Sequence, residues 1–240
     1  MEWWQALILG LVEGITEYLP VSSTGHLIIV SSLLGLGDPA NPDHKAAIDA
    51  FNIVVQGGAI LAVLGLYWPR VVQMLRGLTG KDPAGFRLMV NLFVAFLPAA
   101  FLGLLLHKWI EKHLFFTGPV VGALIVGGIY MMFIEQWRLG RFGRGPTRGI
   151  GGKGLGIEDI TLGKALFIGL LQCFGLWPGT SRSMMTITGG IITGLRPSAA
   201  AEFSFLLGLP TLGAATVYSL YKNLSQAGKP ITPTESNAVS

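Results

Sequence analysis

Charged residues are scarce in this sequence. Asp, Glu, Lys and Arg make up 12% of the 240 residues, whereas soluble domains carry about 25%. Hydrophobic residues make up 51%, and the mean hydropathy is +0.58. This composition predicts an all-α polytopic membrane protein and excludes an ordinary soluble domain.

Cysteine and a basic leader are also lacking. Cys173 is the single cysteine, so no internal disulfide can form. The first residues, Met1-Glu2-Trp3-Trp4, contain no lysine or arginine, and no small-residue cleavage site follows, so we expect no cleavable signal peptide. The net charge of +4 comes from basic residues in loops, without stacking aromatics around them. This distribution argues against nucleic-acid binding and for a topology bias across a membrane.

Apolar stretches of two kinds follow one another along the chain. Four of them approach or exceed the roughly 20 residues that span a bilayer: Ala46–Trp68, Phe86–His107, Thr117–Trp137 and Ala199–Tyr221. Polar connectors are expected at residues 35–45, 70–87, 108–116 and 138–159, and a polar tail at 222–240. The stretches 3–34 and 160–195 are instead interrupted by polar loops, after Pro20 and after Pro178.

The order of features in residues 1–68 returns in residues 160–221. Each has a short helix, a Pro-Ser loop, a short apolar piece and then a full span. Interrupted segments in corresponding halves are typical of inverted repeats. We therefore expect an inverted repeat with two re-entrant helical hairpins plus at least four transmembrane helices, in one membrane domain over residues 1–240. A single crossing with a buried stub remains the competing interpretation.

Basic residues are concentrated in the loops at 70–87 and 138–159. By the positive-inside rule these loops are cytoplasmic. With both interrupted segments taken as re-entrant, the two hairpins enter from opposite faces. Their polar tips then meet near the middle of the membrane.

Two carboxylates lie on the expected helix before the first polar loop. Glu13 and Glu17 are four residues apart and share a helix face. Charges at membrane depth are costly and mark functional sites by default. The pair can hold a divalent cation, Mg²⁺ or Ca²⁺, with phosphate oxygens completing its shell, or one acid can serve as general base. A purely structural carboxylate pair is the alternative.

Hydroxyls and an imidazole follow the two acids. Ser23 and His26 are close enough in sequence to act together, with either one as a nucleophile activated by a neighbouring base. Ser22 and Thr24 add hydroxyls for phosphate binding. A lone histidine in an apolar segment is more often a packed core residue, and that reading stays open.

The second polar loop carries Arg182, whose planar guanidinium matches phosphate as a bidentate fork. The surrounding residues Gly179, Thr180, Ser181 and Ser183 supply backbone and hydroxyl donors. This half predicts an oxyanion or phosphate cradle. The alternative is that Arg182 only neutralises Glu13 or Glu17 as an ion pair within the membrane.

These two motifs, EGITEYLPVSSTGH (13–26) and PGTSRS (178–183), resemble the signatures of bacterial undecaprenyl-diphosphate phosphatases of the bacitracin-resistance type. The likeness extends over essentially residues 1–221. It implies a multi-pass inner-membrane hydrolase that converts undecaprenyl diphosphate to undecaprenyl phosphate for peptidoglycan synthesis. It also implies bacitracin resistance, a periplasm-facing active site and dependence on a divalent cation.

The resemblance places the acidic pair of that family on Glu13 and Glu17, and its arginine on Arg182. Its serine–histidine group falls on Ser22, Ser23 and His26. Met184 stands where many members have glycine, and members continue for about two more spans past the polar tail, which these residues do not contain.

A membrane transporter or lipid flippase that uses the same anion site is the rival function. The residues do not choose between Ser23, His26 and water as nucleophile, nor between the two metals. A homo-oligomer is compatible with the sequence.

Overall fold

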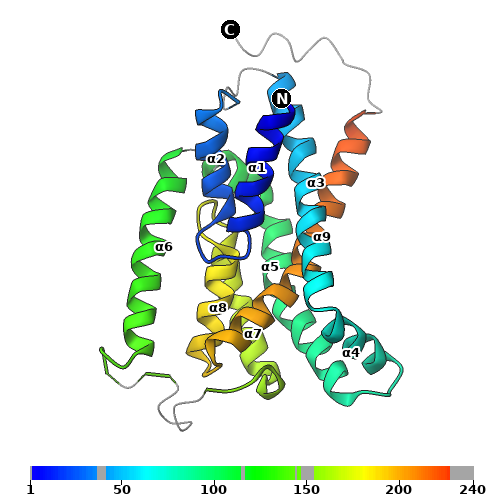
Figure 1. Ribbon diagram of the computed structural model, residues 1–240, viewed down its shortest axis with the longest axis vertical. Coiled ribbons are helices and arrows are strands. Elements are labelled where there is room, and N and C mark those ends of the chain that lie inside the picture. Colours follow the sequence, from blue (N-terminus) through cyan, green and yellow to red (C-terminus); the bar gives the residue numbers. More distant parts are fainter. Residues whose placement is uncertain (1, 37–41, 115–116, 144, 147–153, 228–240) are drawn as a thin grey trace.

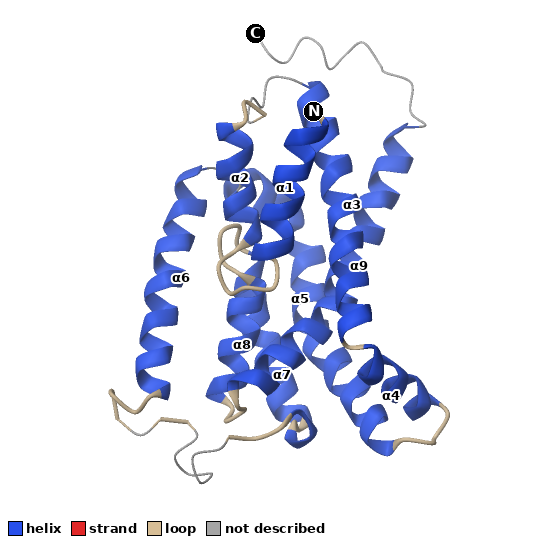
Figure 2. Ribbon diagram, viewed as in Figure 1, coloured by secondary structure: helices blue, strands red, loops and turns tan. Residues whose placement is uncertain are grey.

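The computed structural model describes residues 2–36, 42–114, 117–143, 145–146 and 154–227. Its helices there are α1 (Trp3–Thr16), α2 (Ser23–Leu33), α3 (Pro42–Leu66), α4 (Trp68–Leu78), α5 (Pro83–Leu114), α6 (Thr117–Arg138), α7 (Leu162–Gln172), α8 (Arg182–Ile192) and α9 (Pro197–Ala227). Two 3-10 turns, η2 (Ile157–Asp159) and η3 (Cys173–Leu176), precede and follow α7. The expected all-helical class is confirmed for this part of the chain (Figure 2).

Three helices are long and apolar enough to cross a membrane: Pro83–Ile110 in α5, Gly118–Arg138 in α6 and Pro197–Tyr221 in α9. The end of α3 and α4 pass the same test only together, and they are bent by 81° at their junction. The protein is therefore a multi-pass membrane protein, and its described residues contain three spans, or four if the bent pair counts as one. The expected span Ala46–Trp68 corresponds to α3, which runs unbroken from Pro42 to Leu66, so the bend lies at its end.

The expectation of a connector over residues 70–87 is wrong, because most of it is helical. Helix α4 begins at Trp68 with Pro69 in its first turn, where the missing N–H costs nothing. Arg70, Gln73 and Arg76 recur at intervals of three along one side of this helix, which makes α4 amphipathic. The number of charged residues does not distinguish an amphipathic helix from a polar loop. The spacing of the polar residues along the sequence does distinguish them.

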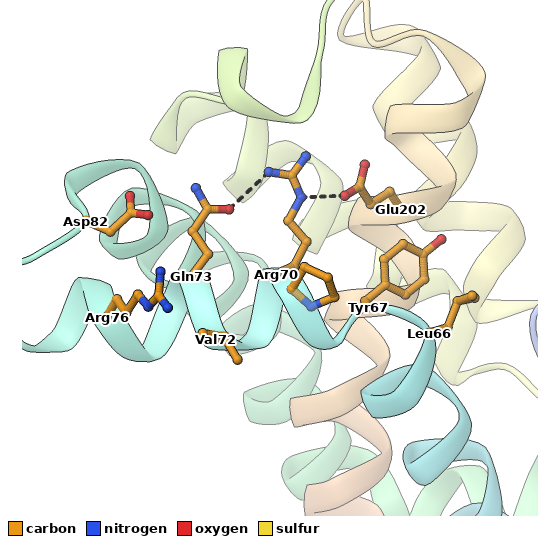
Figure 3. A pocket seen from close by; sticks show the side chains of 9 residues that line it. Leu66, Tyr67, Arg70, Val72, Gln73, Arg76, Asp82 and Glu202 are labelled. Atoms are coloured by element: carbon orange, nitrogen blue, oxygen red, sulfur yellow. Dashed lines mark hydrogen bonds and ion pairs between the residues drawn. The ribbon is translucent and has the colours of Figure 1, made fainter.

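Helix α4 is tied to α9 and η2 through Arg70. Figure 3 shows the Arg70 Nε donating to the Glu202 Oε1, at 2.7 Å. The Arg70 Nη2 donates to the Glu158 Oε1 of η2 at 2.9 Å. Glu202, near the start of α9, therefore fixes the position of Arg70.

The main hydrophobic core lies between α5, α7, α8 and α9, where Leu92, Ile168, Phe203 and Leu207 are buried. Helix α7 packs directly on α5 at Gly169. A Cβ there would lie 2.3 Å from the Ala95 carbonyl oxygen, so only glycine allows this approach. Side chains that face outward from α5 and α6, such as Phe101, Leu104, Ile125 and Ile129, are apolar and exposed, as a lipid-facing surface requires.

The two pairs of short helices approach each other from opposite ends of the molecule. Figure 1 shows α1 and α2 in the upper half, α7 and α8 in the lower half, and the loops of both pairs about midway along the long axis. The Ser183 Oγ donates to the Leu19 carbonyl oxygen at 2.8 Å. Two polar loops that are far apart in sequence are therefore in direct contact.

Candidate active site

The first loop ends in a strained residue. Helix α1 ends at Thr16, and Ser22 caps the start of α2 with φ +64°, accepting a hydrogen bond from the Gly25 N–H. Among the described residues, Ser22 is the non-glycine position with positive φ, a conformation that costs of order 1–3 kcal/mol and persists where the surroundings enforce it. This turn sets Ser23 at the first position of α2.

The second loop depends on one glycine. Gly179 has φ +93°, and a Cβ at this position would lie 2.4 Å from the Val120 carbonyl oxygen of α6. Both features require glycine at this position, and the absence of a side chain lets the loop pack directly against α6. Ser181 then caps α8 by accepting from the Met184 N–H at 3.2 Å. Arg182 consequently occupies the first position of α8, as Ser23 does in α2.

A cavity of about 160 Å³ lies between the two loops. Most of the predicted site residues line it, and its lining comprises Glu13, Glu17, Ser22, Ser23, Thr24, Gln56, Gly175, Thr180, Ser181, Arg182 and Leu212. Helices α1, α2, α3, α8 and α9 all contribute to its wall. We call this space the polar cavity.

Glu17 is the central residue of the polar cavity. Its Oε2 accepts a hydrogen bond from the Ser23 Oγ at 2.6 Å, and its Oε1 accepts from the Arg182 Nη2 at 3.0 Å. The side chains of Arg182 and Glu17 are 12% and 11% exposed. The Arg182 Nη1 also donates to the Ser204 carbonyl oxygen of α9 at 3.2 Å. One carboxylate thus joins a hydroxyl from the first loop to a guanidinium from the second.

Two buried polar atoms in this site lack a hydrogen-bond partner within the described residues: the Glu13 Oε2 and the Arg182 Nε. Unsatisfied buried groups are rare and point to an absent ligand, ion or water. One is an anionic acceptor and the other a cationic donor. A ligand that brings a cation and anionic oxygens together would satisfy both.

The carboxylate oxygens of the site fit a divalent cation only if further oxygen ligands come from a bound substrate. Mg²⁺ and Ca²⁺ take carboxylate oxygens, and Glu13 offers one without a partner. The described residues contain no group of three or more His, Cys, Asp or Glu side chains placed for a metal. Phosphate oxygens of a bound substrate would have to complete such a shell, as the sequence reasoning assumed.

Three predicted residues do not line the polar cavity. Ser183 is occupied by its bond to the Leu19 carbonyl. His26 and Gly179 line a separate groove beside α6. The His26 Nδ1 lies 2.8 Å from the Ser22 carbonyl oxygen, which can only accept, so this nitrogen carries the proton.

Four contributors were not predicted from the sequence: Gln56, Gly175 and Leu212, which line the polar cavity, and the Ser204 carbonyl, which holds Arg182. Gln56 of α3 lines the polar cavity, and its Oε1 accepts from the Thr216 Oγ1 of α9 at 3.1 Å. An amide in the middle of an apolar span was the available signal. The Ser204 carbonyl that holds Arg182 is a backbone group, and no side-chain pattern could reveal it.

Fold and site together define an integral membrane protein with an internal site for a charged ligand. The chain belongs to the family described as "Bacitracin resistance protein BacA", which matches residues 6–239. It is 50% identical to an undecaprenyl-diphosphatase of Sorangium cellulosum over 223 residues, covering 93% of this chain and 68% of that protein. It is also 50% identical to undecaprenyl-diphosphatase 2 of Rhodospirillum rubrum over 219 residues, covering 91% and 73%. An undecaprenyl-diphosphatase of Clostridium novyi is 44% identical over 220 residues, covering 90% and 73%.

Proposed function

We propose that this protein hydrolyses undecaprenyl diphosphate to undecaprenyl phosphate and inorganic phosphate. The family and the names of its relatives support this activity. The observation that carries it is Glu17, which accepts hydrogen bonds from both the Ser23 hydroxyl and the Arg182 guanidinium. The product is the lipid carrier of peptidoglycan synthesis, and its regeneration accounts for bacitracin resistance. The rival reading as a transporter or flippase finds no support in the comparisons.

Ser23 is the proposed nucleophile, with Glu17 as its base. The Ser23 Oγ attacks the terminal phosphorus, its proton passes to the Glu17 Oε2 at 2.6 Å, and the bond from phosphorus to the bridging oxygen breaks. Undecaprenyl phosphate leaves with that oxygen. Water then hydrolyses the phosphoserine and releases inorganic phosphate. The protonated Glu17 returns its proton to the Ser23 oxygen.

Protonation of Glu17 has a second consequence. It weakens the ion pair at 3.0 Å and so frees the Arg182 guanidinium for the oxygens of the transferring phosphoryl group. Charge stabilisation of this kind supplies much of the catalysis of phosphoryl transfer. Thr180 and Ser181 add hydroxyls to the same cavity, and Ser22 and Thr24 face them from the first loop. These four residues are the proposed phosphate-binding set.

His26 is less suited than Ser23 to attack the phosphorus. It lines the groove beside α6, whereas the carboxylates and Arg182 line the polar cavity. A water activated by Glu17 is the remaining alternative. Detection of a phosphoserine at Ser23 would separate these routes.

The charge balance of the site supports the proposal of a divalent cation. Two carboxylates and one guanidinium line the cavity, so with all three ionised the formal charge is −2 + 1 = −1. A diphosphate is itself anionic and would be repelled. We propose that Glu13 and Glu17 hold Mg²⁺ or Ca²⁺ with the phosphate oxygens. When bound, the cation supplies positive charge against the diphosphate.

The proposed topology follows from the loops. The two short helix pairs, α1–α2 and α7–α8, are taken as re-entrant hairpins of an inverted repeat in the bacterial inner membrane. Basic residues are concentrated in the segments 70–87 and 138–159. By the positive-inside rule, we take both segments to be cytoplasmic. The first hairpin then enters from the periplasm, and the polar cavity receives its substrate from that side.

The test is phosphate release from undecaprenyl diphosphate by the purified protein in detergent. We expect Ser23→Ala and Arg182→Ala each to lower kcat by at least about a hundredfold, as loss of a transition-state donor does. Ser32→Ala is the matched control, because Ser32 is an exposed serine on the same helix as Ser23. No release from a folded wild-type protein would refute the function. Near wild-type turnover by Ser23→Ala would refute only the nucleophile.

A further inference from the structure

Two apolar grooves run beside α6, and both reach the second polar loop. One has a volume of about 390 Å³ and is lined by Pro20, Val21, His26, Leu124, Gly127, Gly128, Met131, Gly179, Ser181 and Met184. We call it the His26 groove. The other has a volume of about 400 Å³ and is lined by Pro119, Gly122, Ala123, Val126, Gly127, Tyr130, Trp177, Thr180 and Met185. We call it the Trp177 groove.

The two grooves are separate because α6 touches α8 between them. At Gly127, a Cβ would lie 3.0 Å from the Met184 Cε, so the helices are in close contact there. Gly127 lines both grooves, Met184 lines only the His26 groove and Met185 only the Trp177 groove. The two grooves therefore offer a chain that leaves the polar cavity two separate apolar routes along α6.

The His26 groove has the closer connection to the proposed chemistry. Pro20 and Val21 from the first loop and Gly179 and Ser181 from the second all line it. Ser181 also lines the polar cavity. The Trp177 groove takes residues from the second loop only and shares Thr180 with the cavity. A substrate with its phosphates between both loops leaves through the groove that both loops border.

The lining suits an unsaturated hydrocarbon chain joined to a phosphate. Leu124, Gly128 and Met131 are spaced at i, i+4 and i+7 and form one stripe of α6. Met184 adds a flexible thioether, which adapts to irregular apolar ligands. Apart from these groups, His26 and Ser181 supply the polar side chains of the groove. Its volume falls within the roughly 300–1,000 Å³ of ligand sites.

We infer that the His26 groove holds the first isoprenyl units of the substrate, while the rest of the chain lies in the bilayer. This inference rests on the proposed function. It places the leaving undecaprenyl phosphate beside His26 and Ser181, and the transferring phosphoryl group beside Glu17, Ser23 and Arg182. His26 then serves the leaving group and not the attacking one.

Two glycines of α6 allow a matched test. A Cβ at Gly128 in the His26 groove, or at Gly122 in the Trp177 groove, would meet no atom within 4 Å. Gly128→Leu and Gly122→Leu therefore each fill one groove without a backbone clash. Turnover is measured with undecaprenyl diphosphate and with inorganic diphosphate, which carries no prenyl chain.

We expect Gly128→Leu to lower kcat/KM for undecaprenyl diphosphate about tenfold or more, which corresponds to about 1.4 kcal/mol. Its kcat/KM for inorganic diphosphate should stay within about twofold of the wild-type value, and Gly122→Leu should change neither. A selective loss in Gly122→Leu instead would assign the chain to the Trp177 groove and overturn the inference. Equal behaviour of the two variants would overturn it too.

A second measurement uses the unmodified protein. A prenyl diphosphate with a diazirine near its phosphate end is photolysed on the wild type, and the labelled residues are mapped by mass spectrometry. Labels at Leu124 or Met131 are expected, and labels confined to Val126, Trp177 or Met185 would refute the assignment. Phosphate release by the same preparation tests the enzyme function itself, so failure of the groove and failure of the function are distinguishable.

Discussion

Removal of one partner from the ion pair between Arg182 and Glu17 should be strongly destabilising, and a double-mutant cycle can measure the coupling between the two residues. The Nη2–Oε1 distance is 3.0 Å, and the two side chains are only 12% and 11% exposed. Arg182→Met removes the cation and leaves Glu17 in the same cavity as Glu13 without its partner. Breaking a buried pair in this way costs about 3–5 kcal/mol.

Removal of both charges should cost less than removal of the arginine alone. In the double variant Glu17→Gln, Arg182→Met no uncompensated charge of this pair remains, and replacement of whole buried pairs is often near neutral. We expect the second substitution to recover at least about 2 kcal/mol of the loss, since most of that loss is the stranded carboxylate. The coupling energy equals this recovery plus the cost of Glu17→Gln alone, so it should exceed about 2 kcal/mol.

Thermal unfolding in detergent, without added divalent cation, is the assay. At about 2–4 °C per kcal/mol for a chain of this size, Arg182→Met should lower the Tm by roughly 6–20 °C. The control cycle uses Arg70→Met and Glu158→Gln. The Glu158 side chain is 52% exposed, so its coupling to Arg70 should stay below about 1 kcal/mol. A coupling near zero for Arg182 and Glu17 would show that the pair is not formed, and the reasoning about Glu17 would fail with it.

Three further predictions concern the cation, a glycine and pH. EDTA should abolish phosphate release and added Mg²⁺ or Ca²⁺ should restore it, whereas release that is insensitive to chelation would exclude the proposed cation. Gly179→Ala should lower the Tm well below that of Gly163→Ala, because the Gly179 Cβ would clash with Val120 at positive φ while Gly163 has open space around it; equal Tm values would contradict this. The backbone hydrogen bond of Glu158 and its bond to Arg70 hold the pKa of that carboxyl below its usual range. Its stabilising contribution, below about 1 kcal/mol, is therefore present above pH 4.3 and is lost as the pH falls through the lowered pKa. Unfolding of Glu158→Gln and wild type at pH 7 and near pH 2 should show a difference only at pH 7.

Composition and local pattern alone were enough to predict the class of the molecule and the content of its site. Twelve per cent charge cannot supply a soluble surface, so apolar helices followed from the sequence directly. Prolines after Leu19 and Trp177 predicted short helices, because a proline cannot continue the hydrogen-bond ladder of a helix. The helices end earlier than the prolines require, α1 at Thr16 and α7 at Gln172. Glu13, Glu17 and Arg182 stood out since charges at membrane depth need a reason.

Tertiary structure decided which of these groups share one space. Arg182 and Glu17 are 165 residues apart, and only the packing of α1, α2, α8 and α9 brings them within 3.0 Å. The same packing sends His26 into a groove beside α6 and Ser183 to a backbone carbonyl, although both lie within a few residues of cavity side chains. Sequence spacing fixes the helix face on which a side chain lies, but the neighbour it meets depends on how distant helices pack.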